Sequence, residues 1–179
     1  MPENRIADLF QIQNRYLRSV HLDRDFADTA ALQGYIVTDY AKNNLERIAA
    51  GLSVSSGQRA WRITGDYGSG KSSFALVLAH LFAGRYEGLS PKFKKIIDFK
   101  KIGVSAPHFL PVLVTGSREP LSIALLRSLR NALQGYSERG RLPKVIDKIQ
   151  TQLDKATISD SDDNVIELIS EANAYVSNS

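Results

Sequence analysis

Hydrophobic residues recur at spacings of three and four along much of the chain, which is typical of helices with one buried face. The stretch that begins at Ser72 is apolar on almost every side and is expected to be a buried helix that stops at Gly84. Thr38 is the expected N-cap of an earlier helix, with Gly51 as its stop. In total, the pattern predicts helices over residues 4–20, 39–50, 72–83, 90–99, 119–133, 142–156 and 162–176.

Two shorter runs are rich in β-branched and aromatic residues and are predicted to be strands. They cover residues 59–64 and 109–116, with Pro111 near the start of the second. Each is followed by a predicted helix, and this alternation is typical of a parallel sheet. A right-handed crossover between the two strands would bring Arg118 to the edge of the sheet where the first strand ends. We therefore expect an α/β fold, with Arg118 either in solvent or near a ligand.

The loop between the first strand and its helix carries the most specific motif of the sequence. It fits the phosphate-binding P-loop pattern, also called Walker A: Gly65-Asp66-Tyr67-Gly68-Ser69-Gly70-Lys71-Ser72. A phosphate chain needs several backbone N–H groups that point into one concavity, and glycines permit the necessary turns and close approaches. The N-terminus of the following helix adds further N–H groups and a partial positive charge. The motif predicts a nucleotide site.

Within this motif, single residues have distinct expected roles. Lys71 should contact the β- and γ-phosphates and take part in catalysis, and Ser72 should place its hydroxyl on Mg²⁺. Ser73 caps or packs in this interpretation, and Tyr67 is a candidate for stacking on the nucleotide. Residues 34–38 are a candidate wall beside the adenine. The competing interpretation is a glycine-rich turn before a core helix, with a lysine at the surface.

The motif and its flanks define the expected fold class and domains. We expect a partial P-loop NTPase core with parallel strands, preceded and followed by helices. The expected divisions are a helical preface over 1–52, an incomplete core over 53–135 and a C-terminal helical segment over 136–179.

The composition is that of a globular protein, and it bears on the cellular compartment in which the protein is expected. The 179 residues are 43% hydrophobic and 23% charged, which is ordinary for a folded domain. Cysteine is absent, so disulfides and cysteine–zinc sites are excluded. No signal peptide or membrane-spanning run is recognised, and we expect a cytoplasmic protein without membrane contact. The net charge of +4 is too small to indicate nucleic-acid binding by itself, and the clustered lysines at 92–101 are typical of a solvated face.

One expected element of an NTPase is missing. Such enzymes place an acidic residue at the end of a second apolar strand, where it holds Mg²⁺ and polarises the attacking water. Residues 112–114 form the apolar part of the second predicted strand, but Thr115 and Gly116 follow, and no carboxylate occurs before Glu119. The simplest explanation is that the chain is the N-terminal part of a larger ATPase.

Several segments resemble the start of large bacterial P-loop ATPases of the type found in BREX-like phage-defence systems. The resemblance implies that the expected P-loop core is AAA+-like. It also implies binding of Mg·ATP, a longer chain, assembly into a homo-oligomer or multi-protein complex, and action on DNA. Autonomous hydrolysis is not implied, because the acidic strand is missing. The resemblance covers about residues 20–135 and rests on segments 24–26, 34–38, 60–76 and 110–117.

Three functions remain open on the sequence. The leading one is an ATP-binding module of a larger ATPase. The alternative is a small P-loop kinase that transfers the γ-phosphate to a small molecule. Against it, a helical preface of roughly 60 residues precedes the P-loop, far longer than the usual connections between elements. The third is an interaction module that nucleotide only stabilises.

Overall fold

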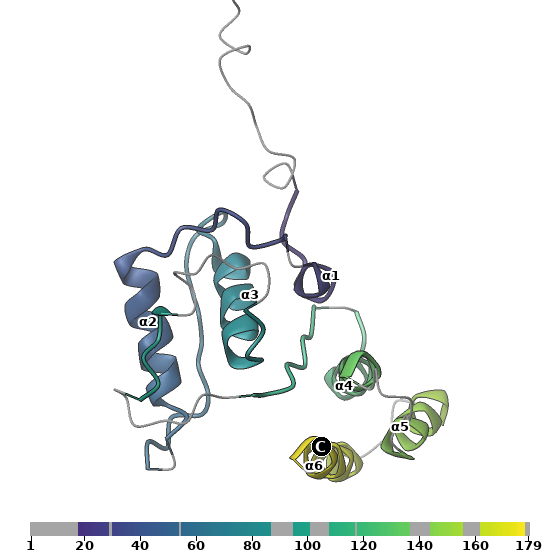
Figure 1. Ribbon diagram of the computed structural model, residues 1–179. Helices are drawn as coiled ribbons and strands as arrows, with labels where there is room; N and C mark the ends of the chain where they lie inside the picture. The colour runs from purple at the N-terminus through teal and green to yellow at the C-terminus, as the bar shows by residue number, and fades with distance from the viewer. Residues whose placement is uncertain are drawn as a thin grey trace, which may run out of the picture.

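The computed structural model describes residues 18–28, 30–53, 55–86, 95–100, 108–116, 118–136, 144–155 and 162–177. These ranges contain six helices that are joined by turns and extended segments (Figure 1). The helices are α1 (Leu22–Ala27), α2 (Asp39–Ala50), α3 (Lys71–Phe82), α4 (Leu121–Tyr136), α5 (Lys144–Lys155) and α6 (Asp162–Ser177).

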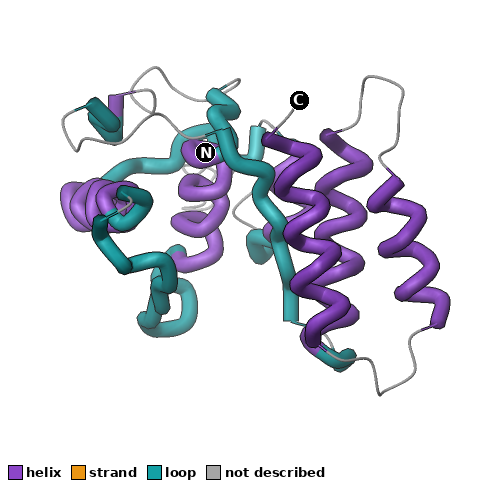
Figure 2. Tube along the Cα trace, turned by 90° about the horizontal axis from the view of Figure 1, so that it is seen from below, coloured by secondary structure: helices purple, strands orange, loops and turns teal. Residues whose placement is uncertain are grey.

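The predicted α/β fold class is wrong. No residue in the described ranges belongs to a strand, and Figure 2 shows only helices and loops there. The expected NTPase core with parallel strands, and the crossover that would place Arg118 at a sheet edge, are therefore not found. The described part of the chain is all-helical.

The physical reason is that, within the described ranges, no backbone hydrogen bond joins the two predicted strands, and each segment contacts a helix. A strand needs a hydrogen-bonded neighbour about 4.8 Å away. Instead, the Phe109 N–H donates to the Phe82 carbonyl oxygen at 2.8 Å, which ties the second segment to the end of α3. In the first segment, the Trp61 ring faces the Arg47 guanidinium of α2, with 5.8 Å from Cζ to the ring centroid.

The first hydrophobic cluster joins α1, α2 and α3 and includes Ile96 and Ile97 of the 95–100 segment. Leu45 of α2 and Leu76 and Leu81 of α3 are among its fully enclosed side chains. Because α2 and α3 both contribute buried side chains to this cluster, it joins the two helices and supports the loop that precedes α3.

The second hydrophobic cluster lies among α4, α5 and α6, each of which packs against the other two (Figure 2). Its fully buried side chains include Leu133 of α4 and Ile149 of α5. Phe109 and Leu110 connect the clusters, because the Phe109 ring meets Phe82 edge-on and Leu110 packs against the second cluster.

Most predicted helix boundaries within the described ranges are close to the observed ones. The helix over 39–50 is confirmed, and its N-cap Thr38 accepts a hydrogen bond from the Ala41 N–H at 3.2 Å. Helix α4 runs to Tyr136, three residues further than predicted. Residues 4–17 of the helix predicted over 4–20 and residues 90–94 of the one over 90–99 lie outside the described residues. The described remainders, 18–20 and 95–99, are not α-helical, so the predictions are wrong there.

Helix α1 was not predicted. Its sequence is rich in acid, and its stability depends on contacts that become visible only in three dimensions. The Asp25 carboxylate is 3% exposed and accepts hydrogen bonds from the His21 N–H at 2.9 Å and from Arg24 Nε at 2.8 Å. Arg18 approaches it at 3.1 Å. Asp25 thus both caps α1 and pairs with two arginines.

None of the helices in the described ranges is long and apolar enough to cross a membrane.

Candidate functional site

The loop before α3 has the backbone geometry that its glycines make possible. Gly68 and Gly70 both adopt positive φ angles, of 79° and 83°. Gly70 is the N-cap of α3 in the left-handed conformation, and the first helical hydrogen bond runs from the Phe74 N–H to the Gly70 carbonyl oxygen at 2.9 Å. The chain therefore turns sharply and enters the helix without a side chain at the turn.

Gly65 has a different role. A Cβ atom at this position would lie 3.0 Å from Ser69 Oγ and 3.9 Å from Lys71 Cδ. The start of the loop therefore approaches its end closely, and glycine keeps that space open.

The Lys71 side chain folds back over this loop. Its Nζ atom donates hydrogen bonds to the carbonyl oxygens of Gly65 at 2.9 Å and Asp66 at 2.6 Å, and lies 3.4 Å from Ser69 Oγ. These acceptors carry no charge. The ammonium group therefore lies in the mouth of the loop without a carboxylate partner among the described residues.

Successive backbone N–H groups remain available at the same place. Within the described part of the chain, no acceptor takes the N–H groups of Gly70, Lys71, Ser72 or Ser73. The first N–H groups of any helix lack intrahelical partners, and the helix dipole adds partial positive charge there. The start of α3 thus offers several donors and a lysine to an anion.

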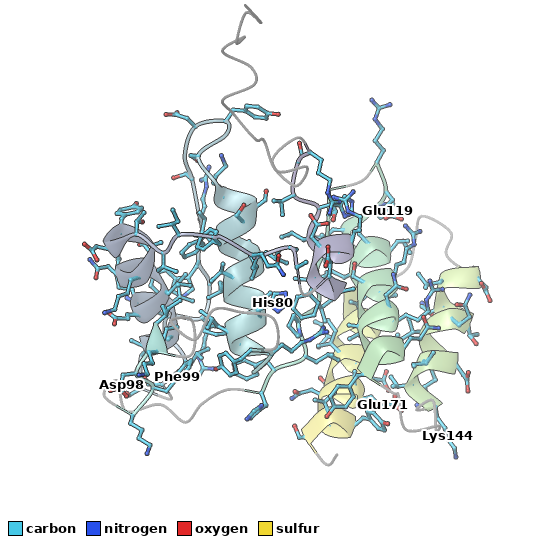
Figure 3. The ribbon with its side chains drawn as sticks, turned by 45° about the horizontal axis from the view of Figure 1, so that its top comes forward. His80, Asp98, Phe99, Glu119, Lys144 and Glu171 are labelled. Atoms are coloured by element: carbon cyan, nitrogen blue, oxygen red, sulfur yellow. The ribbon has the colours of Figure 1, made fainter. Side chains whose placement is uncertain are left out.

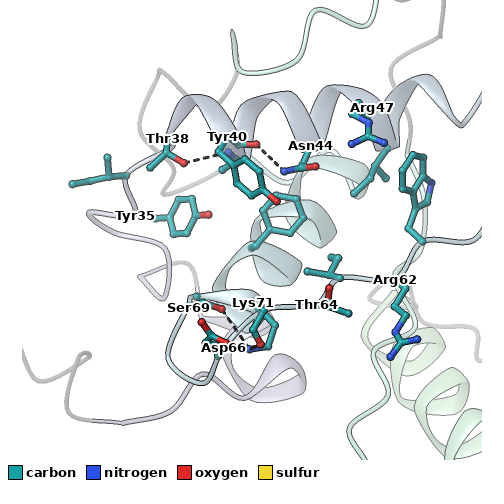
Figure 4. Close-up of a pocket in the computed structure, with 18 residues that line it drawn as sticks. Tyr35, Thr38, Tyr40, Asn44, Arg47, Arg62, Thr64, Asp66, Ser69 and Lys71 are labelled. Carbon is teal, nitrogen blue, oxygen red and sulfur yellow. Dashed lines mark hydrogen bonds between the residues drawn. The ribbon is translucent and has the colours of Figure 1, made fainter.

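A pocket of about 680 Å³ extends from this loop to α2. Figure 4 shows Thr38, Tyr40, Asn44 and Arg47 along the α2 side, facing the loop that carries Asp66, Ser69 and Lys71. The volume lies within the usual range for small-molecule sites.

The lining combines aromatic rings with positive charge. Of the lining residues that the structure describes, Arg47, Arg62 and Lys71 are cationic and Asp66 is the only acid. Four aromatic rings also contribute to it, from Tyr35, Tyr40, Trp61 and Phe74. This combination fits a ligand with a planar apolar part and an anionic part.

No protein-family model, curated protein or solved structure matches the chain. The physical properties of the site therefore carry the functional argument.

The structure brings some of the residues predicted for the site to the pocket and not others. The pocket is lined by part of the motif, namely Gly65, Asp66, Ser69, Gly70 and Lys71. It is also lined by part of the predicted adenine-side wall, namely Tyr35, Ile36 and Thr38. Tyr67 is 99% exposed and does not line the pocket. Gly68, Ser72, Ser73 and Arg118 are not among the lining residues either.

Sequence reasoning missed the contribution of α2. Tyr40 of this helix is 81% exposed. Tyr40, Asn44 and Arg47 recur at spacings of four and three, so a polar and aromatic stripe on one face was the available signal. The spacing alone did not show that this face meets the loop.

Two buried polar residues, Asp25 and His80, do not line the pocket. His80 projects from α3 (Figure 3) and is 2% exposed, and neither ring nitrogen has a partner among the described residues. Burial, reinforced by the charge of Arg85, lowers the pKa of His80. Among the described residues, no three His, Cys, Asp or Glu side chains gather as a metal site.

Proposed function

We propose that the loop from Gly65 to Ser72 binds the polyphosphate chain of a nucleotide, as Mg·ATP, and that the adjoining pocket holds the rest of the molecule. One observation carries this proposal. The Lys71 ammonium contacts only uncharged oxygens, while the N–H groups at the start of α3 lack acceptors among the described residues. A phosphate oxygen forms stronger, charge-assisted hydrogen bonds with both kinds of donor than a neutral acceptor does.

The charge of the pocket supports the same ligand. Arg47 and Arg62 are exposed, and the described lining of their pocket contains one carboxylate. Together with Lys71 they give this described lining three positive charges against one negative, and a nucleoside triphosphate is strongly anionic. Electrostatic attraction would therefore favour its entry.

The residues fit a Mg²⁺ ion that arrives with the nucleotide. Mg²⁺ is usually held by one or two protein oxygens together with phosphates and water. Ser72 lies in the first turn of α3, and its exposed hydroxyl has no partner among the described residues. Ser72 would hold the ion, which would neutralise phosphate charge.

Nucleotide binding is the part of ATPase chemistry that we assign to these residues. Asp66 is the only carboxylate of the described lining, and it lies within the loop that would hold the phosphates. Hydrolysis needs a group that positions or polarises water. We propose that this group comes from further elements or partners, in an assembled ATPase of the BREX-like type that acts on DNA.

The proposal is tested by isothermal titration with a non-hydrolysable ATP analogue and Mg²⁺. Lys71→Ala should weaken binding by roughly 10- to 100-fold, because charged hydrogen bonds are worth about 1.5–3 kcal/mol. Lys42→Ala is the matched control, since Lys42 is exposed on α2, pairs with Glu46 at 3.9 Å and does not line the pocket. Equal affinity of the parent and Lys71→Ala would contradict the proposal.

A further inference from the structure

Three α2 side chains with recognition chemistry lie on the pocket side of that helix. Tyr40, Asn44 and Arg47 are four and three residues apart, which places them on one helix face. All three line the pocket that the phosphate loop also lines, and Figure 4 shows Asn44 between the other two along α2. A nucleotide whose phosphates lie at Lys71 would bring its base toward this face.

The Asn44 side chain is held in one orientation and retains unused hydrogen-bonding groups. Its Nδ2 atom donates to the Tyr40 carbonyl oxygen at 2.9 Å, which uses one of two amide protons. Its Oδ1 atom has no partner among the described residues. The amide of this pocket residue thus retains one N–H donor and the Oδ1 acceptor.

We propose that this pocket selects adenine, with Asn44 pairing with the edge of the base and Tyr40 stacking on its face. The inference rests on the proposed function, because it presumes that the phosphates bind at Lys71. An asparagine amide pairs with the amino donor and the adjacent ring nitrogen of adenine.

Guanine fits this lining less well. Its N1 and N2 groups are adjacent donors, whereas the Asn44 amide has a single acceptor atom, Oδ1, and cannot pair with both in parallel. Asp66, the only carboxylate among the described lining residues, belongs to the phosphate loop (Figure 4). One guanine donor would therefore have no acceptor from Asn44, and an unpaired polar group opposes binding.

Tyr40 supplies the apolar part of base recognition. Its ring is 81% exposed, so its surface is available to a ligand, and Tyr35, Trp61 and Phe74 add aromatic surface to the same pocket. Stacking on an aromatic ring is open to every base. Tyr40 therefore contributes affinity, and Asn44 contributes the choice of base.

The test compares ATP, GTP and tripolyphosphate as ligands of the full chain, each with Mg²⁺, by isothermal titration. The parent should prefer ATP to GTP. Asn44→Ala should weaken the affinity for ATP by about tenfold, the equivalent of about 1.4 kcal/mol. It should change the affinity for tripolyphosphate by no more than about twofold. Asn43→Ala is the matched control, because Asn43 is the exposed neighbour on α2 and does not line the pocket. Alanine favours helix, so both variants should fold.

The outcomes separate the two proposals. If tripolyphosphate binds but the parent does not distinguish ATP from GTP, or if Asn44→Ala keeps full ATP affinity, adenine selection is overturned and phosphate binding stands. If the parent binds none of the three ligands, phosphate binding itself is overturned, and adenine selection with it.

Discussion

The Nζ atom of Lys71 lies 2.6 Å from the carbonyl oxygen of Asp66, five residues earlier in the chain. The lysine therefore closes the loop on itself through hydrogen bonds to neutral carbonyl oxygens. If the proposed phosphate binds here, hydrogen bonds from the ammonium to phosphate oxygens would be stronger than these. A loop that is already closed would also cost less to order on binding.

Gly70→Ala should damage both stability and binding. At a φ of 83°, a residue with a Cβ atom costs about 1–2 kcal/mol. Because Gly70 lines the pocket, the displaced backbone would also misdirect the N–H groups, and nucleotide affinity should fall by about tenfold or more. Urea unfolding and calorimetric titration measure the two effects.

The matched control for this variant is Gly57→Ala. Gly57 has a φ of 62°, its added Cβ would meet no atom within 4 Å, and it does not line the pocket. It should show a similar loss of stability with unchanged nucleotide binding. If both variants lost binding equally, strain in the chain and not the geometry of the loop would be responsible.

Asp25→Asn should destabilise the first cluster by about 1–3 kcal/mol, because a buried carboxylate that accepts charged hydrogen bonds loses its charge. The arginine partners are half-exposed, so water can hydrate their guanidinium groups in the variant, and the loss of stability should stay moderate. Chemical denaturation measures the difference. Asp28→Asn is the control, since Asp28 is exposed and an amide oxygen can also accept the Ala30 N–H.

Asp25 also contributes to the free energy of unfolding in a way that depends on pH in the acid range. The hydrogen bond from Arg24, above all, lowers the pKa of Asp25, with help from the His21 N–H and the Arg18 charge. This contribution is present above the unfolded value of about 3.9 and is lost as pH falls through the folded pKa. Asp25→Asn should lack this loss, and an unchanged acid limb would show that other carboxylates dominate it.

His80 should also make stability decrease on acidification, but this loss should begin at a higher pH than the loss caused by Asp25. An unfolded histidine takes up a proton near pH 6.5, whereas burial lowers the pKa of His80 in the fold. Between the two values the unfolded chain binds more protons, so stability decreases as pH falls below about 6.5, by at most about 1.4 kcal/mol per pH unit. Unfolding free energies from pH 7.5 to 5 measure the slope.

A leucine in place of His80 should remove this slope, because an apolar side chain suits the contact with Phe26, whose ring centroid lies 4.7 Å away. His108→Gln is the control and should keep the slope, since His108 is exposed. A slope that persisted in His80→Leu would assign the pH dependence to another group.

Local sequence determined much of what was predictable here. The Thr38 cap, the apolar α3 helix and the turn glycines 68 and 70 act over a few residues, and each was readable from the sequence. The loop motif was equally local, because its glycines and lysine are consecutive or nearly so.

Long-range pairing could not be predicted in the same way. Residues 59–64 and 109–116 have the composition of strands, but composition does not show whether a neighbouring strand exists, and here Phe109 bonds to α3. The pocket wall on α2 was missed for the same reason. Asn44 becomes a candidate ligand group only when α2 and the loop are seen to face each other (Figure 4).

The most direct test of the central claim is an NMR titration of the ¹⁵N-labelled chain with Mg²⁺ and tripolyphosphate. If the loop holds phosphate, the amide protons of Gly70, Lys71 and Ser72 should shift downfield together and saturably, and Lys71→Ala should weaken the response. If these amides did not move while others did, or if Lys71→Ala responded like the parent, the loop would not be the phosphate site.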